Sequence, residues 1–374
     1  MKSKRLLLAM EDIKDEFIEA AAPKEKKKPT ALWVKICAAA ACIALIVAVG
    51  AGMLYEKPQA LPMLELDNIF DGGMSMEAHF AYSADELINS NPWSAENSPK
   101  KLTVYKNTAY TPSGAEMPQT DFMNMKNVLL EAAEKLGVRV SEADIETSET
   151  AISVEKDKVK ITLNAWLMLN VYISGENVLP DGYTLDCYAG FDEISKTAEY
   201  LKNKYSAFLG MKNPQADISM GDYNVLGRRN FSLAFYDADS DIEKSIENYN
   251  FGRVSFSVYD DGTLHISQSV GGREPVGNYP IISPGEATEL LEQGEYYTSV
   301  FIDFPGVQAV KKVELVYCKS SVAKTFVPYY RFYIEVEHEG TIAEDFPGMK
   351  SFGTYYVPAV EGKYISDHRA ELFQ

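Results

Sequence analysis

Three aspartates at alternate positions, Asp237, Asp239 and Asp241, come closest to a ligand set for a cation. Calcium loops of the EF-hand type begin with such carboxylates, but they also need a glycine at the sixth position and a glutamate at the twelfth. Here Ile242 and Asn248 occupy these positions. We therefore interpret the aspartates as a polar turn that opens a helix over residues 242–249, with a calcium loop as the alternative.

The histidines do not form a catalytic or zinc-binding motif. They lie far apart in the sequence, at positions 79, 265, 338 and 368. His338-Glu339 lacks the second histidine of the H-E-x-x-H motif of zinc proteases. The chain also has no G-x-S-x-G motif and no glycine-rich nucleotide loop. We therefore predict no catalytic, cofactor-binding or metal site, no cofactor, and no enzyme activity.

The cysteines do not indicate a fold built on disulfides. Cys187 and Cys318 are the only ones beyond an apolar stretch near the N-terminus, and both lie in strand-like contexts. One disulfide between them and two buried free thiols are the alternatives, and the sequence does not decide between them.

The composition indicates a folded chain with a strongly acidic surface. Hydrophobic residues make up 46% of the sequence, which is ordinary for a globular protein. The net charge of −18 argues against binding to nucleic acid or to an anionic surface. The 374 residues suffice for one large or two medium domains.

An apolar stretch, Ile36–Leu54, organises the rest of the chain. Its nineteen residues include no charge and no proline. At about 1.5 Å per residue, a helix of this length crosses the ~30 Å hydrocarbon core of a bilayer. We predict an uncleaved transmembrane helix. A cleaved signal peptide and a lipoprotein anchor at Cys42 are the alternatives.

The charges around this stretch predict its orientation. Nine Lys and Arg residues against six Asp and Glu residues give the segment up to Lys35 a net charge of +3, and the rest of the chain carries −21. Lysines flanking a span stay on the cytoplasmic side. We therefore predict a protein of the cell membrane with a cytoplasmic N-terminus and an extracytoplasmic C-terminal domain.

One face of the predicted span consists of small residues. Ala40, Ala44, Ala48 and Gly52 are each four positions apart. Such a row lets a second helix approach closely. A homodimer through the span is therefore one hypothesis, and the alternative is that alanine is simply common in such spans.

The cytoplasmic tail contains a short amphipathic helix. Over residues 9–22, Met10, Ile13 and Phe17 recur at helical spacing with acidic residues between them. The helix cannot bury this stripe alone, so it either docks on a cytoplasmic partner or lies near the membrane. A basic linker over residues 23–30 follows.

Periodic patterns beyond the span predict a mixture of helices and strands. Helices are expected over residues 121–136, 192–209 and 284–293, the second capped by Asp192. The third opens with the capping box Ser283-Pro284-Gly285-Glu286. Strands are expected through Cys187 and over residues 101–105, 151–154, 159–163, 167–173, 230–236, 253–259, 263–270, 313–318, 326–337 and 353–360.

The predicted fold class is α+β, with a single N-terminal transmembrane helix and an exterior, mainly antiparallel domain with a few packed helices. The domain is expected to form two lobes, and Arg331 and Glu335 are expected on the solvent face of their strand. The predicted division is a tail (1–35), the span (36–54), a stalk with loops (55–100), lobe 1 (101–215) and lobe 2 (216–374).

The last third of the sequence resembles a family of bacterial membrane regulators. The succession YPIISPGEATELL, KKVELVYCKS, FVPYYRFYIEV and GTYYVPAVEGKYI is similar to the end of the YycH/YycI-type regulators of Gram-positive two-component systems. The resemblance covers about 95 residues and implies a role, restraint of a membrane sensor kinase, without any catalytic residue. The tail helix and basic linker look more like the cytoplasmic heads of membrane-bound anti-sigma-type proteins.

Together these features predict a single-pass regulator in signal transduction. Its exterior domain is expected to sense or scaffold, and to regulate a sensor kinase or sigma factor by protein contact. The alternative is an exterior binding or cell-envelope domain on a passive anchor. The ligand or signal, the partner and the oligomeric state are not specified by the sequence.

Overall fold

The structure is a computed structural model that describes residues 60–66, 77–111, 121–175, 178–319, 323–337 and 345–366. The predicted tail and the predicted span Ile36–Leu54 lie outside these residues. None of the helices within these ranges is long and apolar enough to cross a bilayer. The chain divides into the units Met1–Ala60 and Leu61–Gln374, and the elements below belong to the second.

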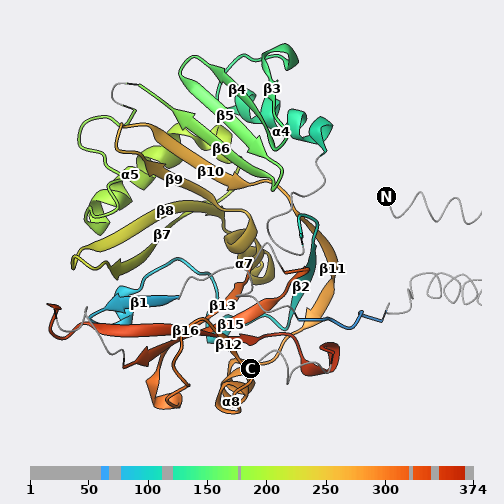
Figure 1. The fold of residues 1–374 in the computed structure, drawn as a ribbon, viewed down its shortest axis with the longest axis vertical. Coiled ribbons are helices and arrows are strands. Elements are labelled where there is room, and N and C mark those ends of the chain that lie inside the picture. Colours follow the sequence, from blue (N-terminus) through green and yellow to red (C-terminus); the bar gives the residue numbers. More distant parts are fainter. Residues whose placement is uncertain are drawn as a thin grey trace, which may run out of the picture. The chain divides into compact units, whose positions relative to one another are not determined.

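The largest sheet of the described residues is antiparallel and eight-stranded, in the order β3-β4-β5-β6-β10-β9-β8-β7 (Figure 1). Its inward residues alternate along each strand, as in Ile152 and Val154, because successive side chains point to opposite faces. The strands are β3 (Glu146–Thr147), β4 (Ala151–Lys156), β5 (Val159–Asn164), β6 (Met168–Ile173), β7 (Pro214–Tyr223), β8 (Arg229–Asp237), β9 (Val254–Val258) and β10 (Leu264–Ser269).

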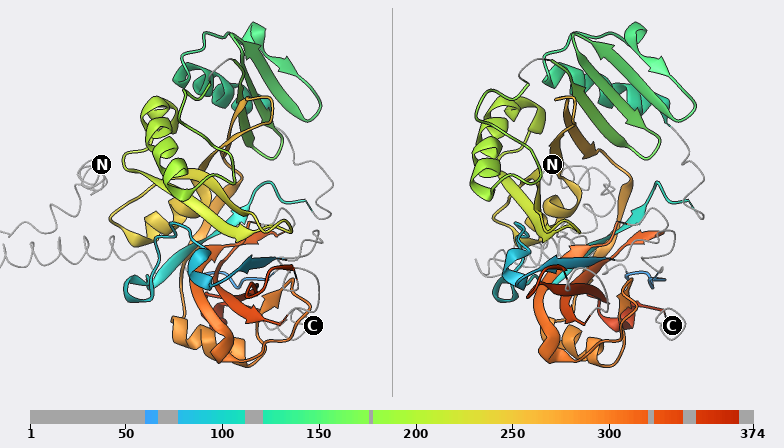
Figure 2. Two further views of the ribbon diagram at one scale, coloured as in Figure 1. Left: turned by 90° about the vertical axis from the view of Figure 1, so that its left-hand side faces the viewer. Right: turned by 60° about the vertical axis from the view of Figure 1, so that its left-hand side comes forward.

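Helices α4 (Phe122–Lys135), α5 (Phe191–Lys204) and α6 (Ser206–Leu209) pack on this sheet and share one core with it (Figure 2). The Asp121 side chain caps α4 by accepting a hydrogen bond from Asn124 N at 3.1 Å. Gly137, with φ +75°, ends the helix as the sequence predicts. The described residues therefore show an α+β fold with mainly antiparallel sheets.

A second antiparallel sheet contains the C-terminal strands in the order β1-β16-β15-β13, and β12 also pairs with β16. Helix α8 (Pro284–Glu292) packs on β16, and α7 (Ile242–Phe251) contacts both β8 of the large sheet and β13 of this one (Figure 1). The strands are β1 (Ala78–Ala81), β12 (Tyr297–Thr298), β13 (Val310–Tyr317), β15 (Pro328–Val336) and β16 (Lys350–Pro358).

A small third sheet has the order β11-β2-β14. Its strands are β11 (Arg273–Pro280), β2 (Lys101–Asn107) and β14 (Thr325–Phe326). β11 follows directly after β10 of the large sheet, so this small sheet extends from the end of the large one.

Several local predictions are confirmed. The turn Asp260-Asp261-Gly262 joins β9 and β10, and Gly262 has φ +82°, a value that a residue without Cβ adopts readily. The capping box of α8 is present: Ser283 Oγ accepts from Glu286 N at 3.2 Å, and Ser283 N donates to Glu286 Oε2 at 2.8 Å.

The prediction of a strand through Cys187 is wrong. Asp186 forms a local turn in which its carboxylate accepts a hydrogen bond from Tyr188 N at 2.9 Å, and this turn chemistry prevails over strand propensity. The following helix begins at Phe191 and not after Asp192, because Glu193 accepts from Gly190 N and caps the earlier turn. The helix also breaks at Tyr205, between α5 and α6.

The predicted boundary between two lobes at residues 215 and 216 falls inside a strand. β7 begins at Pro214 and pairs with β8 from Pro214 onward, so the large sheet continues across this position. The sequence Asn213-Pro214 has the composition of a loop, but proline is tolerated at the first residue of a strand.

The predicted stalk is partly built into the domain. Leu64 and Leu66 are buried, β1 pairs with β16, and Leu87 is also buried. The prolines and asparagines of this stretch indicate loops, yet the apolar residues between them have partners from the C-terminal part of the chain.

Candidate functional site

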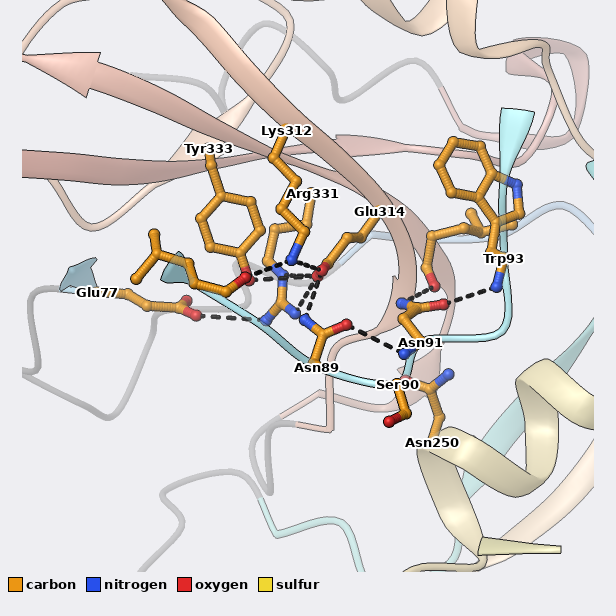
Figure 3. Close-up of polar contacts among 12 residues, drawn as sticks. Glu77, Asn89, Ser90, Asn91, Trp93, Asn250, Lys312, Glu314, Arg331 and Tyr333 are labelled. Carbon is orange, nitrogen blue, oxygen red and sulfur yellow. Dashed lines mark hydrogen bonds and ion pairs between the residues drawn. The ribbon is translucent and has the colours of Figure 1, made fainter. Parts of the chain in front are cut away.

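A buried carboxylate, Glu314, lies at the centre of a polar cluster between the two large sheets (Figure 3). It stands on β13 directly opposite Arg331 of β15 and is only 3% exposed. Unpaired, such a charge would be costly, so its partners determine what the cluster can do.

Each oxygen of Glu314 contacts donors from two residues. Arg331 Nη2 donates to Oε2 at 2.5 Å, and Lys312 Nζ lies 2.7 Å from Oε1. Asn89 Nδ2 and Tyr333 Oη complete the set, at 2.5 Å from Oε1 and 3.2 Å from Oε2. Four donor residues from three parts of the chain therefore converge on one carboxylate.

Two opposing effects, burial and the neighbouring positive charges, determine the pKa of Glu314. Burial raises it, but the positive charges and hydrogen bonds of Arg331 and Lys312 outweigh burial and lower the pKa to about 2. The group therefore stays ionised at physiological pH. An ionised carboxylate of this kind can hold the neighbouring donors in place, but it is poorly suited to exchanging a proton.

Arg331 also contacts the segment that enters the domain. Its Nη1 lies 3.6 Å from Glu77 Oε1, while Tyr356 Oη donates to the other oxygen of Glu77 at 2.5 Å. The predicted solvent face of β15 is only partly exposed: the Arg331 side chain is 19% exposed and pairs with Glu314 on the neighbouring strand. Glu335, on the same strand, is half-exposed and pairs with Lys350 at 2.9 Å.

Asn89, Ser90 and Asn91 connect the cluster to the large sheet. Ser90 N donates to Asp217 Oδ1 on β7 at 2.7 Å, and Asn91 Nδ2 donates to Leu315 O on β13 at 3.1 Å. The segment therefore binds one sheet on each side.

Asp217 differs from Glu314 in the charge around it. It is completely buried, and one cation, Arg253, lies 2.6 Å from its Oδ2. Burial raises the pKa of Asp217, and the single arginine and the Ser90 N–H only partly offset this. The pKa values of two buried carboxylates in the same interface are thus shifted in opposite directions: that of Asp217 is raised and that of Glu314 is lowered.

A further attachment lies at the bulge of β7. Arg229 donates through Nη2 to Glu86 O at 2.7 Å and through Nε to Gly221 O at 2.8 Å. Gly221 has φ +68°, and a Cβ there would lie 2.4 Å from Glu86 O. Only glycine allows the two backbones to approach so closely.

The first described residues after the predicted span are hydrogen-bonded to the C-terminal part of the domain. Leu64 N donates to Tyr364 O at 2.8 Å, and Ser366 N donates to Leu64 O at 2.9 Å. We use the term entry segment for residues 61–66 and 77–93. It contacts the C-terminal residues, β16, β7 and β13 in turn.

The residues singled out in the sequence have local roles in the structure. Asp241 caps α7 by accepting from Glu243 N, Asp239 pairs with Lys244 at 2.7 Å, and Asp237 accepts from Asn213 N at 2.7 Å. They form the predicted polar turn. Within the described ranges, no group of three or more His, Cys, Asp or Glu side chains could hold a metal ion.

Cys187 and Cys318 are free thiols in the structure. Cys187 is exposed in its turn, and Cys318 follows β13. Burial raises the pKa of the Cys318 thiol well above its ordinary value, which makes it a weak nucleophile. Of the histidines, His79 contacts Asp222 at 3.2 Å, and the ring of His265 stacks on Tyr172.

The patterns in the sequence do not predict the polar cluster. Its members are far apart in the chain, and Asn89-Ser90-Asn91-Pro92 has the composition of an ordinary loop. The one usable signal was the charged pattern of KKVEL and YYRFY on strands that are otherwise apolar. No protein-family model matches the chain, and no curated protein is significantly similar to it.

Proposed function

We propose that this chain is a single-pass membrane protein whose exterior domain regulates a signalling partner by protein contact. The predicted span Ile36–Leu54 and its basic flank support the topology, with the N-terminus in the cytoplasm. The amphipathic face of Ile13 and Phe17 supports a partner on that side. The proposed partner is a sensor kinase or a sigma factor.

One observation carries the proposal: the entry segment is hydrogen-bonded to both large sheets. Asn91 is bound to β13 and Ser90 to β7, while Leu64 is bound to the C-terminal residues. A passive tether would need no such attachment. Because the segment contacts each sheet directly, a change in how the sheets meet would displace the chain that leads back to the span.

In the proposed mechanism, this displacement changes the tilt or association of the span. The small-residue row from Ala40 to Gly52 would allow two spans to approach closely. The change would expose or hide the apolar face of the tail helix. The similarity of the C-terminal third to YycH/YycI-type regulators points to the same kind of role.

The experiment is a cross-linked capture from membranes with the full chain and with a chain that lacks residues 1–22. A sigma factor or sensor kinase captured only by the full chain supports the proposal. Capture of the same envelope components by both chains supports the alternative, an exterior binding domain on a passive anchor. Equal membrane levels of the two proteins provide the control.

A further inference from the structure

A cavity of about 470 Å³ lies where the large sheet meets the small sheet and the end of α7. Pockets of ~300–1,000 Å³ are typical of small-molecule sites. Its wall combines aromatic rings, hydroxyl groups and two cations. The lining includes Trp166, Phe251, Arg253, Ser255, Ser267 and Lys319.

Strands β9 and β10 of the large sheet form one wall of the cavity, and this wall is polar. Ser255 of β9 lies directly opposite Ser267 of β10, and Arg253 and Ser269 follow at alternate positions. Residues two apart on a strand share one face, so these side chains point to the same side. Val254 and Phe256 point to the other side, into the main core.

The two cations are held in different ways. Arg253 is bound to Asp217 at 2.6 Å, which fixes the guanidinium but leaves further N–H donors. Lys319 donates to the backbone oxygen of Asn250 at the end of α7. Within the described ranges, Lys319 has no carboxylate partner, and no carboxylate lines the cavity.

A third cation stands beside the cavity. The Arg273 guanidinium lies 4.6 Å from the ring centre of Phe251, which is also a wall residue. Within the described part of the chain, the ion pairs of these three cations include one carboxylate, Asp217, although the net charge of the chain is −18. A bound anion would relieve their mutual repulsion.

We propose that this cavity binds a small organic anion, with its carboxylate or phosphate group at Arg253 and Lys319 and its apolar or aromatic body against Trp166 and Phe251. Charge-assisted hydrogen bonds from Arg and Lys favour such groups. The hydroxyls of Ser255 and Ser267 provide additional donors. This binding site goes beyond the proposed function and does not depend on it.

The test measures binding to the full chain in detergent by isothermal titration calorimetry. The probes are benzoate and phenyl phosphate, with benzyl alcohol as the neutral probe of similar shape. We expect saturable binding at one site for at least one anion. We expect binding of the alcohol to be weaker by about tenfold or more, because it lacks the charge.

Variants assign the binding to this cavity. Lys319 is an exposed residue after the end of β13 and its ammonium contacts a backbone oxygen, so Lys319→Gln should fold, and it should weaken anion binding by about tenfold. Ser267→Ala should weaken it to a lesser extent. Lys212→Gln, at an exposed lysine that does not line the cavity, is the matched control and should bind like the unaltered chain.

Three results would overturn this inference. They are no saturable binding of either anion, equal binding of benzoate and benzyl alcohol, and equal losses in Lys319→Gln and Lys212→Gln. None of them affects the capture experiment above, so the two proposals fail separately.

Discussion

Glu314 and Arg331 face each other across the β13–β15 ladder, with Arg331 Nη2 at 2.5 Å from Glu314 Oε2. The pair does more than join two strands. Through Asn89 on one side and Glu77 on the other, it holds the entry segment against the C-terminal sheet.

Glu314→Gln should destabilise the domain strongly. The change removes the buried charge that pairs with the partly buried Arg331 and Lys312, and leaves Arg331 with Glu77 alone. Breaking a buried pair in this way typically costs about 3–5 kcal/mol. Denaturant unfolding of the full chain measures this. Glu335→Gln is the matched control, because Glu335 is a half-exposed glutamate in the same sheet and its ion pairs are worth about 0.2–1 kcal/mol. Equal losses in the two variants would contradict the role given to Glu314.

The stability of the domain should fall in acid because of the same residue. The pKa of Glu314 is about 2 in the folded state against an ordinary value of 4.5. Its stabilisation is therefore complete above pH 4.5 and is lost as the pH falls from 4.5 toward 2. Unfolding measured across this range should show a shallower fall for Glu314→Gln. Parallel curves for the two proteins would refute this explanation.

Gly221→Ala should weaken the attachment of the entry segment to β7. The new Cβ meets Glu86 O at 2.4 Å, in addition to the strain of φ +68°. Gly262→Ala has the same kind of backbone strain, but nothing lies within 4 Å of its Cβ. The difference between the two variants isolates the steric contact, and we expect about 1–3 kcal/mol more loss at Gly221. Proteolysis near residue 86 should also become faster only in Gly221→Ala.

Anion binding in the cavity should depend on pH through Lys319. Desolvation of the ammonium, followed by the charges of Arg253 and Arg273 that face it, lowers the pKa of Lys319 to about 8 from 10.5. The cation is present below pH 8 and is lost as the pH rises through that value. Benzoate stays ionised throughout, so its affinity should decline between pH 7 and 10.5. A Lys319→Arg variant should keep its affinity, and an equal decline in that variant would exclude Lys319 as the cause.

Elements with strong local signals were predictable from the sequence. The β9–β10 hairpin has its Asp-Asp-Gly turn, α8 has its capping box, and α4 has both an N-cap and a glycine stop. Each of these signals is contained within a few neighbouring residues. The fold class followed from them.

Features that depend on distant partners were not predictable in the same way. Asn89 and Glu314 are 225 positions apart, and nothing in either local sequence indicates the other. Arg331 alternates like a surface residue, and the strand pattern does not reveal that Glu314 and Glu77 both lie beside its guanidinium. Strand β7 was missed because Asn-Pro marks a loop more often than the start of a strand.

The most direct test of the central claim concerns the face of the tail that the exterior domain is proposed to expose or hide. We would measure partner capture by the full chain carrying Ile13→Asp and Phe17→Asp, at equal membrane levels. The control carries Lys14→Gln and Glu16→Gln, which alter the polar face without changing the net charge. Loss of the captured sensor kinase or sigma factor in the first variant alone is the predicted result. Unchanged capture in both variants would contradict regulation through the tail.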